Sequence, residues 1–458
     1  MTGNEIVVGR RFDSEARPER RWIAGKFHGM DFAVVRTRMN RHYKWAVVGM
    51  LWFVCFFNYA DRQAVFSVFP KLKGEFGFDP VQLGLIGSAF MWIYAAGAPF
   101  AGFLADRLPR KHLILGGCLF WSGITVMTGW CGRLWQFVTV RALEGFGETF
   151  YFPATMSLVS DYHGARTRSR AFSLHQSSVY IGTIGGGWAG AWFAETYGWR
   201  VGFYFFGCAG VALALVLYRF LREPVRGAAD AVETPALPSL GVSEVAHVIF
   251  RKPTVLLLMG AFLSANFVAT IFLSWTPTFL IEKFSFKLTA AGLSGSVFIH
   301  LASALSVPLG GVLADWLAGR FAGGRMMVQA FGLLAGATFV GIVGLTSSVT
   351  TLLTAMTLFG LCKGLYDANI FASLFDVIEP RARATAAGIM NTVGWGGGAL
   401  GPLAVGLATK YGRHAKAIDN MSEAIAFGAI IYVIGAGLLL TAALGFAGRD
   451  VVRVSTPA

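Results

Sequence analysis

Three ionisable residues stand at helical spacing within a largely apolar stretch of the chain, residues 134–161. Arg141, Glu144 and Glu148 occupy positions i, i+3 and i+7, so a helix would place them on one face. An ionisable side chain in the interior of a bilayer costs roughly 2.5–3.5 kcal/mol on insertion scales. We therefore expect all three to face the inside of a helix bundle or a water-filled cavity, where they could bind an anion or carry a proton.

A second polar face lies in the first apolar stretch of the chain. Asn58, Asp61 and Arg62 stand at i, i+3 and i+4 and share one side of a helix, with Tyr59 beside them. Arginine suits a carboxylate ligand because its planar fork binds two oxygens and stays charged when it loses water. We therefore assign substrate binding to Asn58, Tyr59, Arg62 and Arg141. The alternative is that Arg62 only neutralises a neighbouring acid.

Asp61, Glu144 and Glu148 are the candidate proton carriers. Loss of water favours the protonated form of a carboxyl group, and a nearby arginine favours the ionised form. A carboxyl group that gains and loses an arginine partner during a cycle would therefore take up and release a proton. Two structural alternatives stay open: a permanent ion pair with Arg62 that holds two helices together, and a purely structural pair of Arg141 with Glu144.

The composition is typical of a polytopic membrane protein. Of the 458 residues, 55% are hydrophobic and 14% are charged, whereas soluble proteins carry about 25% charged residues. The mean hydropathy is +0.57, and the apolar stretches reach the roughly 20 residues that cross a bilayer. The basic residues behind the net charge of +14 lie between these stretches. They therefore indicate topology and not nucleic-acid binding.

These patterns predict an all-α membrane protein with twelve transmembrane helices in two six-helix pseudo-repeats. The first six spans are residues 45–69, 83–105, 113–130, 134–161, 171–193 and 201–220. The second six are residues 254–281, 290–314, 326–345, 352–376, 385–409 and 424–446. The predicted divisions are a basic, poorly ordered tail (1–43), a first bundle (44–221), a linker (222–252), a second bundle (253–447) and a C-terminal tail (448–458).

The two halves repeat one another in sequence. Residues 102–107 after the second span resemble residues 311–316 after the eighth, and Asp106 is thereby matched with Asp315. The loops after the fourth and tenth spans also match, with a constant offset. A parallel repeat of six helices, with substrate bound between the halves near the middle of the membrane, is the arrangement of one large class of transporters.

The constant offset between the halves pairs four more polar or aromatic residues. It makes Gln176 the counterpart of Asn391, and Tyr180 the counterpart of Trp395. Gln176 and Asn391 are neutral hydrogen-bonding groups at matching depths, which suits recognition of hydroxyl groups. We assign all four residues to substrate binding.

A further charged pair lies in the second half. Lys363 and Asp367 are four residues apart in the tenth span, so they share one helix face. One interpretation is that they only neutralise each other. The other is that Lys363 is a second contact for an anion, and we include both residues in the substrate-binding set.

A conformational gate is predicted at the loop after the second span. Asp106, Arg107 and Arg110 form its charged part, and Asp315 is the counterpart in the second half. An acid at this position can lie at the N-terminus of a neighbouring helix, in the eleventh span, and stabilise one conformer through the helix dipole. The alternative is that these charges only set the topology.

The positions of basic loops predict the orientation. Nearly all Lys- and Arg-rich loops fall on one side, so we expect both termini to be cytoplasmic in a cell inner membrane. The five cysteines have no spacing of a metal site or disulfide framework, and no nucleotide-binding signature is present. The sequence therefore predicts no metal and no cofactor, with an ion gradient as the source of energy.

The segment Gly102-x3-Asp106-Arg107-x2-Arg110-Lys111 is similar to the loop signature of the major facilitator superfamily. With the repeat and the number of spans, nearly the whole chain resembles that superfamily. The resemblance implies a transporter that works by alternating access between two six-helix bundles.

Two branches of the superfamily resemble this chain. The anion:cation symporter family resembles it in Asn58-Tyr-Ala-Asp61-Arg62 and in Arg141-x6-Glu148. That resemblance implies that Asp61, Arg62, Arg141 and Glu148 bind the anion and couple it to protons. Spinster-like lipid transporters share the Asp-Arg pair and the Gly-x-Gly-Glu segment that ends at Glu148.

The sequence therefore predicts a secondary active transporter, not an enzyme, that carries a small organic anion together with protons. A sugar acid or related carboxylate is the expected substrate, and a monomer in the lipid bilayer is the expected form. The alternative is a spinster-like, proton-coupled transporter of lysophospholipids or sphingoid-type amphiphiles. A small polar cavity would favour the first and a tall apolar cavity the second.

Overall fold

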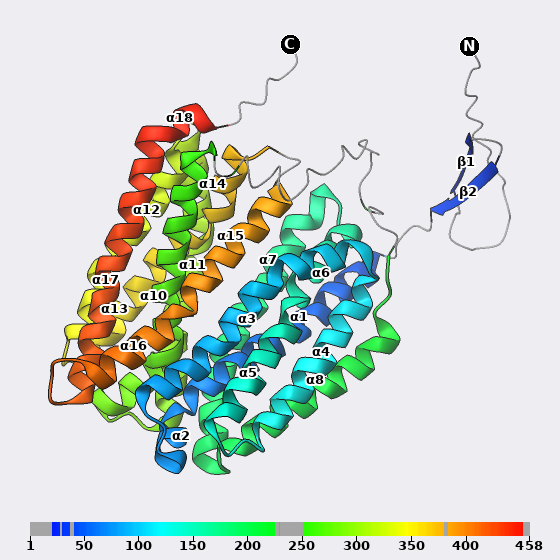
Figure 1. Cartoon of the computed structure of the whole chain (residues 1–458). Helices are drawn as coiled ribbons and strands as arrows, with labels where there is room; N and C mark the ends of the chain where they lie inside the picture. The colour runs from blue at the N-terminus through cyan, green and yellow to red at the C-terminus, as the bar shows by residue number, and fades with distance from the viewer. Residues whose placement is uncertain are drawn as a thin grey trace.

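The computed structural model describes residues 21–27, 30–36, 41–224, 229, 249, 251–379 and 383–451, apart from a few side chains such as that of Asp106. Figure 1 shows two groups of long helices side by side, one coloured blue to green and the other green to red. The short helix α18 lies at one end of the bundle, which we term the terminal end, and α2 lies at the opposite end, the α2 end.

The N-terminal half contains the helices α1 to α8. They are α1 (Arg41–Ser67), α2 (Phe69–Phe76), α3 (Pro80–Arg107), α4 (Arg110–Thr128), α5 (Leu134–Thr149), α6 (Tyr151–Tyr162), α7 (Ala165–Thr196) and α8 (Trp199–Phe220). The turn from α2 into α3 has clear local causes. Gly77 adopts a left-handed conformation that ends α2, and Asp79 caps α3 in a reciprocal pair of hydrogen bonds with Gln82.

The C-terminal half contains the helices from α10 onward. They are α10 (Pro253–Phe284), α11 (Leu288–Ala318), α12 (Gly324–Leu345), α13 (Val349–Asp367), α14 (Ile370–Val377), α15 (Arg383–Gly398), α16 (Leu400–Tyr411) and α17 (Ala417–Thr441). A short π-helical segment, η2 (Ala442–Phe446), and α18 (Ala447–Asp450) follow. The predicted linker, residues 222–252, lies largely outside the described residues, and the two predicted tails are described only in part.

Each predicted span coincides with one long helix or with two consecutive helices. The expectation that residues 134–161 form one continuous helix is wrong, and two spans of the second half are divided as well. The span 134–161 is divided into α5 and α6, because Pro153 has no N–H to offer Thr149, where α5 ends. Pro402 divides α15 from α16 after Gly398 in the same way. Between α13 and α14, the Asn369 side chain bonds to the carbonyl of Leu365 and competes with the helix ladder.

Seven segments of the described chain are long and apolar enough to cross a membrane by length and composition. They are residues 80–102, 199–220, 253–284, 288–318, 324–345, 349–377 and 417–450. The helices α1 and α5 are not among them. Both carry charged residues in their apolar stretches, and α5 is only 16 residues long because of the break before α6.

Two short strands precede the first helix. The strands β1 (Arg21–Phe27) and β2 (Met30–Arg36) pair antiparallel, with Arg21 opposite Arg36. They lie within the predicted N-terminal tail, whose order stays a prediction, whereas the membrane-spanning part is helical as predicted.

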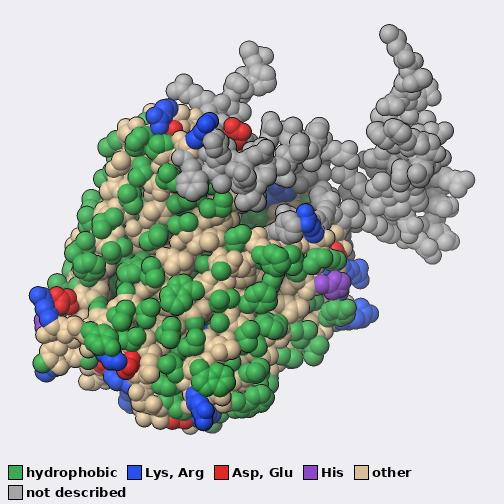
Figure 2. Space-filling model, in the orientation of Figure 1, with side chains coloured by type: hydrophobic (Ala, Val, Ile, Leu, Met, Phe, Trp, Pro, Cys, Tyr) green, Lys and Arg blue, Asp and Glu red, His purple; other side chains and the backbone are tan. Residues whose placement is uncertain are grey.

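The two halves meet along two seams. On one seam α7 packs against α11, and on the other α3 packs against α15 and α16. The first seam depends on glycine, because a Cβ atom on Gly187 would lie only 2.8 Å from the carbonyl oxygen of Gly292. In Figure 2 hydrophobic side chains cover the middle of the visible face, and charged side chains gather toward its two ends. This distribution suits a protein surrounded by lipid.

Candidate functional site

The charged residues predicted on the first and fourth spans meet inside the N-terminal half. Arg62 on α1 donates from Nε and Nη2 to Glu148 Oε2 on α5, with an Nε–Oε2 distance of 3.1 Å. About one turn back along α5, Arg141 donates from Nη1 to Glu144 Oε2. No side chain of the two pairs is more than 4% exposed. Shielding from water strengthens the attraction within each pair, and it makes any unpaired charge costly.

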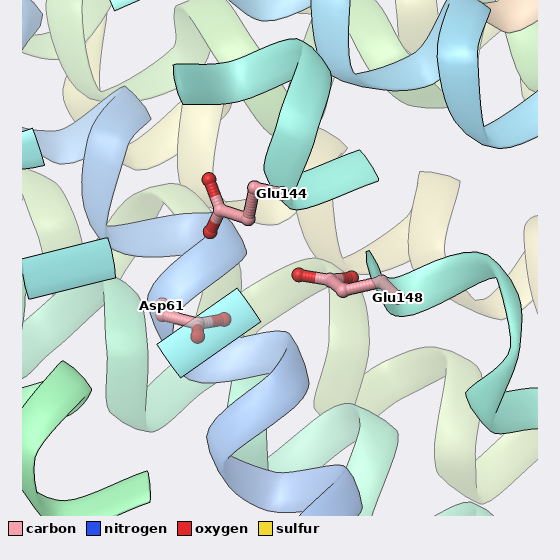
Figure 3. Close-up of side chains that lie close together, drawn as sticks. All are labelled: Asp61, Glu144 and Glu148. Carbon is pink, nitrogen blue, oxygen red and sulfur yellow. The ribbon is translucent and has the colours of Figure 1, made fainter. Parts of the chain in front are cut away.

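A third carboxylate, that of Asp61, joins these two pairs. Its Oδ1 accepts the backbone N–H of Arg62 at 2.7 Å, and its Oδ2 accepts the Thr125 hydroxyl at 3.3 Å. Figure 3 shows Asp61, Glu144 and Glu148 directed toward a common space, and one oxygen of each lies within 4.8 Å of the others. We term Asp61, Glu144 and Glu148 the acidic cluster.

The acidic cluster has the spacing of a possible cation site. Three carboxylates this close could ligate a metal ion. However, Glu148 and Glu144 already have positive partners in Arg62 and Arg141. The guanidinium groups therefore supply the positive charge that a bound cation would otherwise bring.

Aromatic rings enclose the Arg62 guanidinium. Its Cζ lies 4.6 Å from the ring centre of Tyr59, 4.5 Å from Phe90, 5.3 Å from Tyr94 and 5.7 Å from Trp395. Trp395 belongs to the C-terminal half, and its ring also lies 5.5 Å from that of Tyr94. Cation–π attraction of this kind contributes about 0.5–2 kcal/mol per contact. Arg62 is thus held at the seam between the halves, where a movement of α15 would change its surroundings.

Several buried polar atoms around Arg62 make no hydrogen bond within the described part of the chain. They are Asn58 Nδ2, Arg62 Nη1, Glu148 Oε1 and two nitrogens of Arg141, Nε and Nη2. Such atoms are expensive to leave unpaired. The set contains donors from two arginines and an amide, which together suit an oxygen-rich anion.

The predicted polar residues of the second half form a separate group. Lys363 and Asp367 on α13 make an ion pair with side chains 19% and 31% exposed. Tyr180 on α7 reaches across from the other half, close enough to interact electrostatically with both. The Tyr180 ring also lies 6.3 Å from that of His300 on α11. This group is more accessible than the Arg62–Glu148 pair.

The other predicted residues are not all gathered at these two places. Trp395 reaches Arg62, but the described contacts join neither Gln176, which is exposed, nor Asn391, which is half-buried, to the acidic cluster. Three contributors were not singled out from the sequence: Phe90, Tyr94 and Thr125. Phe90 and Tyr94 stand four residues apart on α3, and this aromatic spacing was the available signal. A lone threonine such as Thr125 gave none.

Comparison with known proteins identifies the fold. Residues 51–402 match the Major Facilitator Superfamily. The chain belongs to this superfamily. It is a transporter and not an enzyme, as the sequence predicts.

The curated relatives of this superfamily member include proteins named as anion transporters and spinster proteins. The chain is 28% identical to the Arabidopsis thaliana sodium-dependent phosphate transport protein 1 of the chloroplast, over 81% of this chain and 74% of that protein. It is 26% identical to a probable galactarate/D-glucarate transporter of Escherichia coli (strain K12), over 62% and 68%. It is 27% identical to the spinster protein of Drosophila melanogaster, over 77% and 60%.

A solved structure has the same fold. It is a bacterial homologue of the human lysosomal transporter spinster, crystallised in an inward-facing and unoccupied conformation. The TM-score is 0.81 at 21% sequence identity, over 91% of this chain and all of that one. At this identity the likeness concerns the fold alone.

Two of the four predicted gate residues, Arg110 and Asp315, form ion pairs within their own halves. The side chain of Asp106 lies outside the described residues. Arg110 forms a buried ion pair with Asp161 of α6, in the same half. In the C-terminal half, Arg325 bridges Asp315 at 2.6 Å and Asp376 at 3.0 Å. Each half therefore has its own charged network at the terminal end, and a gate between them stays a prediction.

At the α2 end of the transporter, in contrast, ion pairs connect the halves. Lys73 bonds to Glu282 at 2.6 Å, and Lys410 bonds to Asp79 at 2.8 Å. Burial is the largest single influence on Asp79 and opposes its ionisation. The hydrogen bond and positive charge of Lys410, together with the backbone N–H groups of Gln82 and Val81, outweigh it and lower the Asp79 pKa below its usual value. Within the described residues, these are the ion pairs that join the two halves. We term the Asp79–Lys410 and Lys73–Glu282 pairs the α2-end latch.

Proposed function

We propose that the protein is a proton-coupled symporter of a small organic anion, a sugar acid or related carboxylate, that works by alternating access. The observation that supports this most is the buried acidic cluster, in which three carboxylates share two arginines. If all five groups were ionised, the cluster would have one negative charge in excess.

An excess charge at this position is costly. An unpaired ionised side chain inside a membrane costs roughly 2.5–3.5 kcal/mol or more, and Asp61 and Glu148 are both almost fully buried. One proton shared among the three carboxylates removes the excess. The closed cluster therefore favours a state that has taken up one proton.

Anion binding would follow at Arg62. A substrate carboxylate can take the place of Glu148 on the planar fork, which already has Nη1 unpaired. The displaced Glu148 would then lie beside a second negative charge, so its protonated form is favoured. Anion and proton are thus bound together, and this is the condition for symport. Because Trp395 contacts Arg62, anion binding at Arg62 would change the contact with the C-terminal half.

The relatives support an anion as substrate. The names of the plant and Escherichia coli proteins specify phosphate and galactarate or D-glucarate. These ligands are oxygen-rich anions, and two of them carry hydroxyl groups as well. Lys363, half-buried beside Tyr180, is our candidate for a second anion contact on the other half. Gln176 and Asn391 would reach the substrate after the halves move.

The orientation belongs to the same proposal. Basic residues concentrate at the loops of the terminal end, so this end faces the cytoplasm of a cell whose inner membrane holds the protein. The α2-end latch then closes the outer side. Protons would drive uptake through a monomer.

Transport in proteoliposomes tests the proposal. Uptake of labelled galactarate or another sugar acid should rise when the outside is acidified, and internal pH should change with each addition of substrate. Uptake driven by a sodium gradient, with no response to a proton gradient, would contradict proton coupling and would assign the acidic cluster to Na⁺. Absence of any organic-acid uptake would contradict the substrate class.

A spinster-like amphiphile transporter is the second candidate. The aromatic enclosure of Arg62 by Tyr59, Phe90, Tyr94 and Trp395 favours it, because such rings also suit an apolar ligand. A competition experiment separates the two. Sugar acids should displace a labelled organic anion, whereas displacement only by lysolipids or sphingoid bases would favour the second candidate.

A further inference from the structure

A groove opens on the outside of the N-terminal half, remote from the charged cluster. It lies where α1 begins and α8 ends and has a volume of about 450 Å³. Its floor is apolar, formed by Ala46 and Met50 of α1 and by Leu217 and Phe220 of α8. Nothing in the transport cycle proposed above uses this groove.

The groove lies at the border between apolar and polar chain. The spans predicted from the sequence begin at Trp45 on α1 and end at Phe220 on α8. The floor therefore belongs to the part of both helices that lies among lipid tails. The rim, in contrast, consists of polar residues at or just beyond the span ends: Tyr43, Arg219 and Arg222. An apolar floor with a basic rim matches the change from lipid tails to anionic headgroups at a membrane surface.

The rim is held in place by its own hydrogen bonds. The Tyr43 hydroxyl donates to the carbonyl oxygen of Phe220 at 2.8 Å and accepts the backbone N–H of Arg222 at 2.9 Å. The Arg222 guanidinium lies 5.4 Å from the ring centre of Tyr43. The end of α8 is thus fixed to the start of α1, and the groove is preformed.

The positive charge of the rim is not neutralised within the described part of the chain. Arg219 and Arg222 are exposed and form none of the ion pairs there. The nearby acid, Glu223, is engaged elsewhere, because its carboxylate accepts the backbone N–H groups of Arg110 and Lys111 at the start of α4. Lys111 adds a third cation, 4.6 Å from the ring centre of Tyr218.

We propose that this groove binds one anionic phospholipid, with its phosphate between Arg219 and Arg222 and an acyl chain on the apolar floor. Basic pockets between helices at the cytoplasmic side of a membrane suit anionic lipid headgroups. A free phosphate would leave the apolar floor uncovered. The chain's own N-terminal arm is a poor alternative occupant, because residues 1–40 carry more Lys and Arg than Asp and Glu.

The test measures lipid binding by the full-length protein. Purified protein in detergent receives phosphatidylglycerol or phosphatidylcholine, and native mass spectrometry counts retained lipids while a thermal scan records the melting temperature. We expect one retained phosphatidylglycerol and a higher melting temperature than with phosphatidylcholine. Each basic residue contributes roughly fivefold to the attraction of an anionic surface. Arg219→Gln with Arg222→Gln should therefore weaken phosphatidylglycerol binding about 25-fold.

A matched control uses two arginines of the same end in the other half. Arg320 lies over the Trp316 ring, and Arg449 pairs with Asp450. Arg320→Gln with Arg449→Gln removes the same charge and should leave phosphatidylglycerol binding unchanged. Equal losses in both double variants would mean general surface attraction and would overturn the proposal.

A second variant tests the floor while keeping both rim arginines. Ala46→Trp fills the groove and should abolish retention of phosphatidylglycerol, although the net charge is unchanged. Glycerol phosphate, the headgroup without acyl chains, should not compete at the same concentration. Normal lipid retention by Ala46→Trp, or full competition by glycerol phosphate, would show that the groove is not the lipid site. Since substrate transport is not the readout, these results do not depend on the proposed function.

Discussion

Arg62 and Glu148 join α1 to α5 through an ion pair whose side chains are 4% and 0% exposed. The same guanidinium lies 5.7 Å from the Trp395 ring centre of the opposite half. One side chain thus contacts the acidic cluster and the partner bundle together. A change in charge at Glu148 can therefore alter the contact between the halves, which alternating access requires.

Arg62→Lys should impair transport although the charge is kept. An ammonium group cannot reproduce the two-oxygen fork or the stacking on aromatic rings. Hydrogen bonds to charged groups contribute about 1.5–3 kcal/mol, so substrate affinity should fall about 10- to 100-fold. Binding is measured by the change in melting temperature with substrate, and uptake is measured in proteoliposomes.

A matched control for this substitution is Arg200→Lys. Arg200 pairs with Glu75 at 2.7 Å and lies 4.3 Å from the Trp199 ring centre, at the surface of the α2 end. Arg200 thus has the same kinds of contact as Arg62, but it is not buried. The Arg200→Lys variant should therefore transport normally. Wild-type affinity in Arg62→Lys would exclude direct carboxylate binding by Arg62.

Much of the site was predictable because the signals were local. Arg141, Glu144 and Glu148 follow helical spacing, and a charged stripe inside a membrane must face inward. The structure buries all three, as predicted. The pair of Arg141 with Glu144 was among the open alternatives, because their i, i+3 spacing is local. The partner of Arg62 could not be chosen from the sequence, because both Asp61 and Glu148 were candidates and the choice depends on how α1 and α5 are placed.

Non-local contacts and helix breaks account for most of what the sequence did not reveal. The rings of Phe90 and Tyr94 lie around Arg62 only because α3 packs against α5 and the Arg62 side chain reaches them from α1. The division of span four at Thr149 follows from Pro153, so this local signal was present. The latch could not be foreseen, since Asp79 and Lys410 lie in different halves and meet only after folding.

Lys363→Met tests the second anion contact. If Lys363 binds one end of the substrate and Arg62 the other, a dicarboxylate should lose about tenfold or more in affinity, while a monocarboxylate of similar length should lose little. The reason is that only the dicarboxylate places a charge at each site. Affinities come from inhibition of labelled-substrate uptake.

Lys71→Met is the control for Lys363→Met, because Lys71 is exposed on α2. It should leave both affinities unchanged. Equal losses for the two ligand classes in Lys363→Met would favour the alternative that Lys363 and Asp367 only neutralise each other.

Asp79→Asn should weaken the α2-end latch without harming α3. Asparagine caps a helix as well as aspartate does, so the cap on α3 is kept and only the pair with Lys410 is lost. Exposed ion pairs contribute about 0.2–1 kcal/mol, so the open population should rise at most about fivefold. Spin labels on exposed Lys71 and Lys287, one in each half, would measure the opening as a longer distance.

The pH dependence of this latch has a definite sign. Because the pKa of Asp79 is lowered in the closed pair, the stabilisation is present above the ordinary range of a carboxyl group. It is lost as the pH falls through the lowered pKa. The spin-label distance should therefore not change between pH 7 and pH 5. A latch that opens within that range would have to depend on another group.

Glu148→Gln should separate anion exchange from proton coupling. The amide has the shape of the protonated acid, and it removes a negative charge next to the bound anion. The variant should bind substrate at least as tightly as the wild type and should exchange labelled substrate across the membrane at equal concentrations. It should not accumulate substrate when the outside is acidified, because no proton can bind at residue 148. Paired counterflow and pH-driven uptake in proteoliposomes measure both properties, and Glu423→Gln at the exposed pair with Arg413 is the control.

Loss of counterflow together with uptake would give Glu148 a structural role as the partner of Arg62. If both activities persist, the coupling proton resides on Asp61 or Glu144, and the same pair of assays on Asp61→Asn and Glu144→Gln identifies which one.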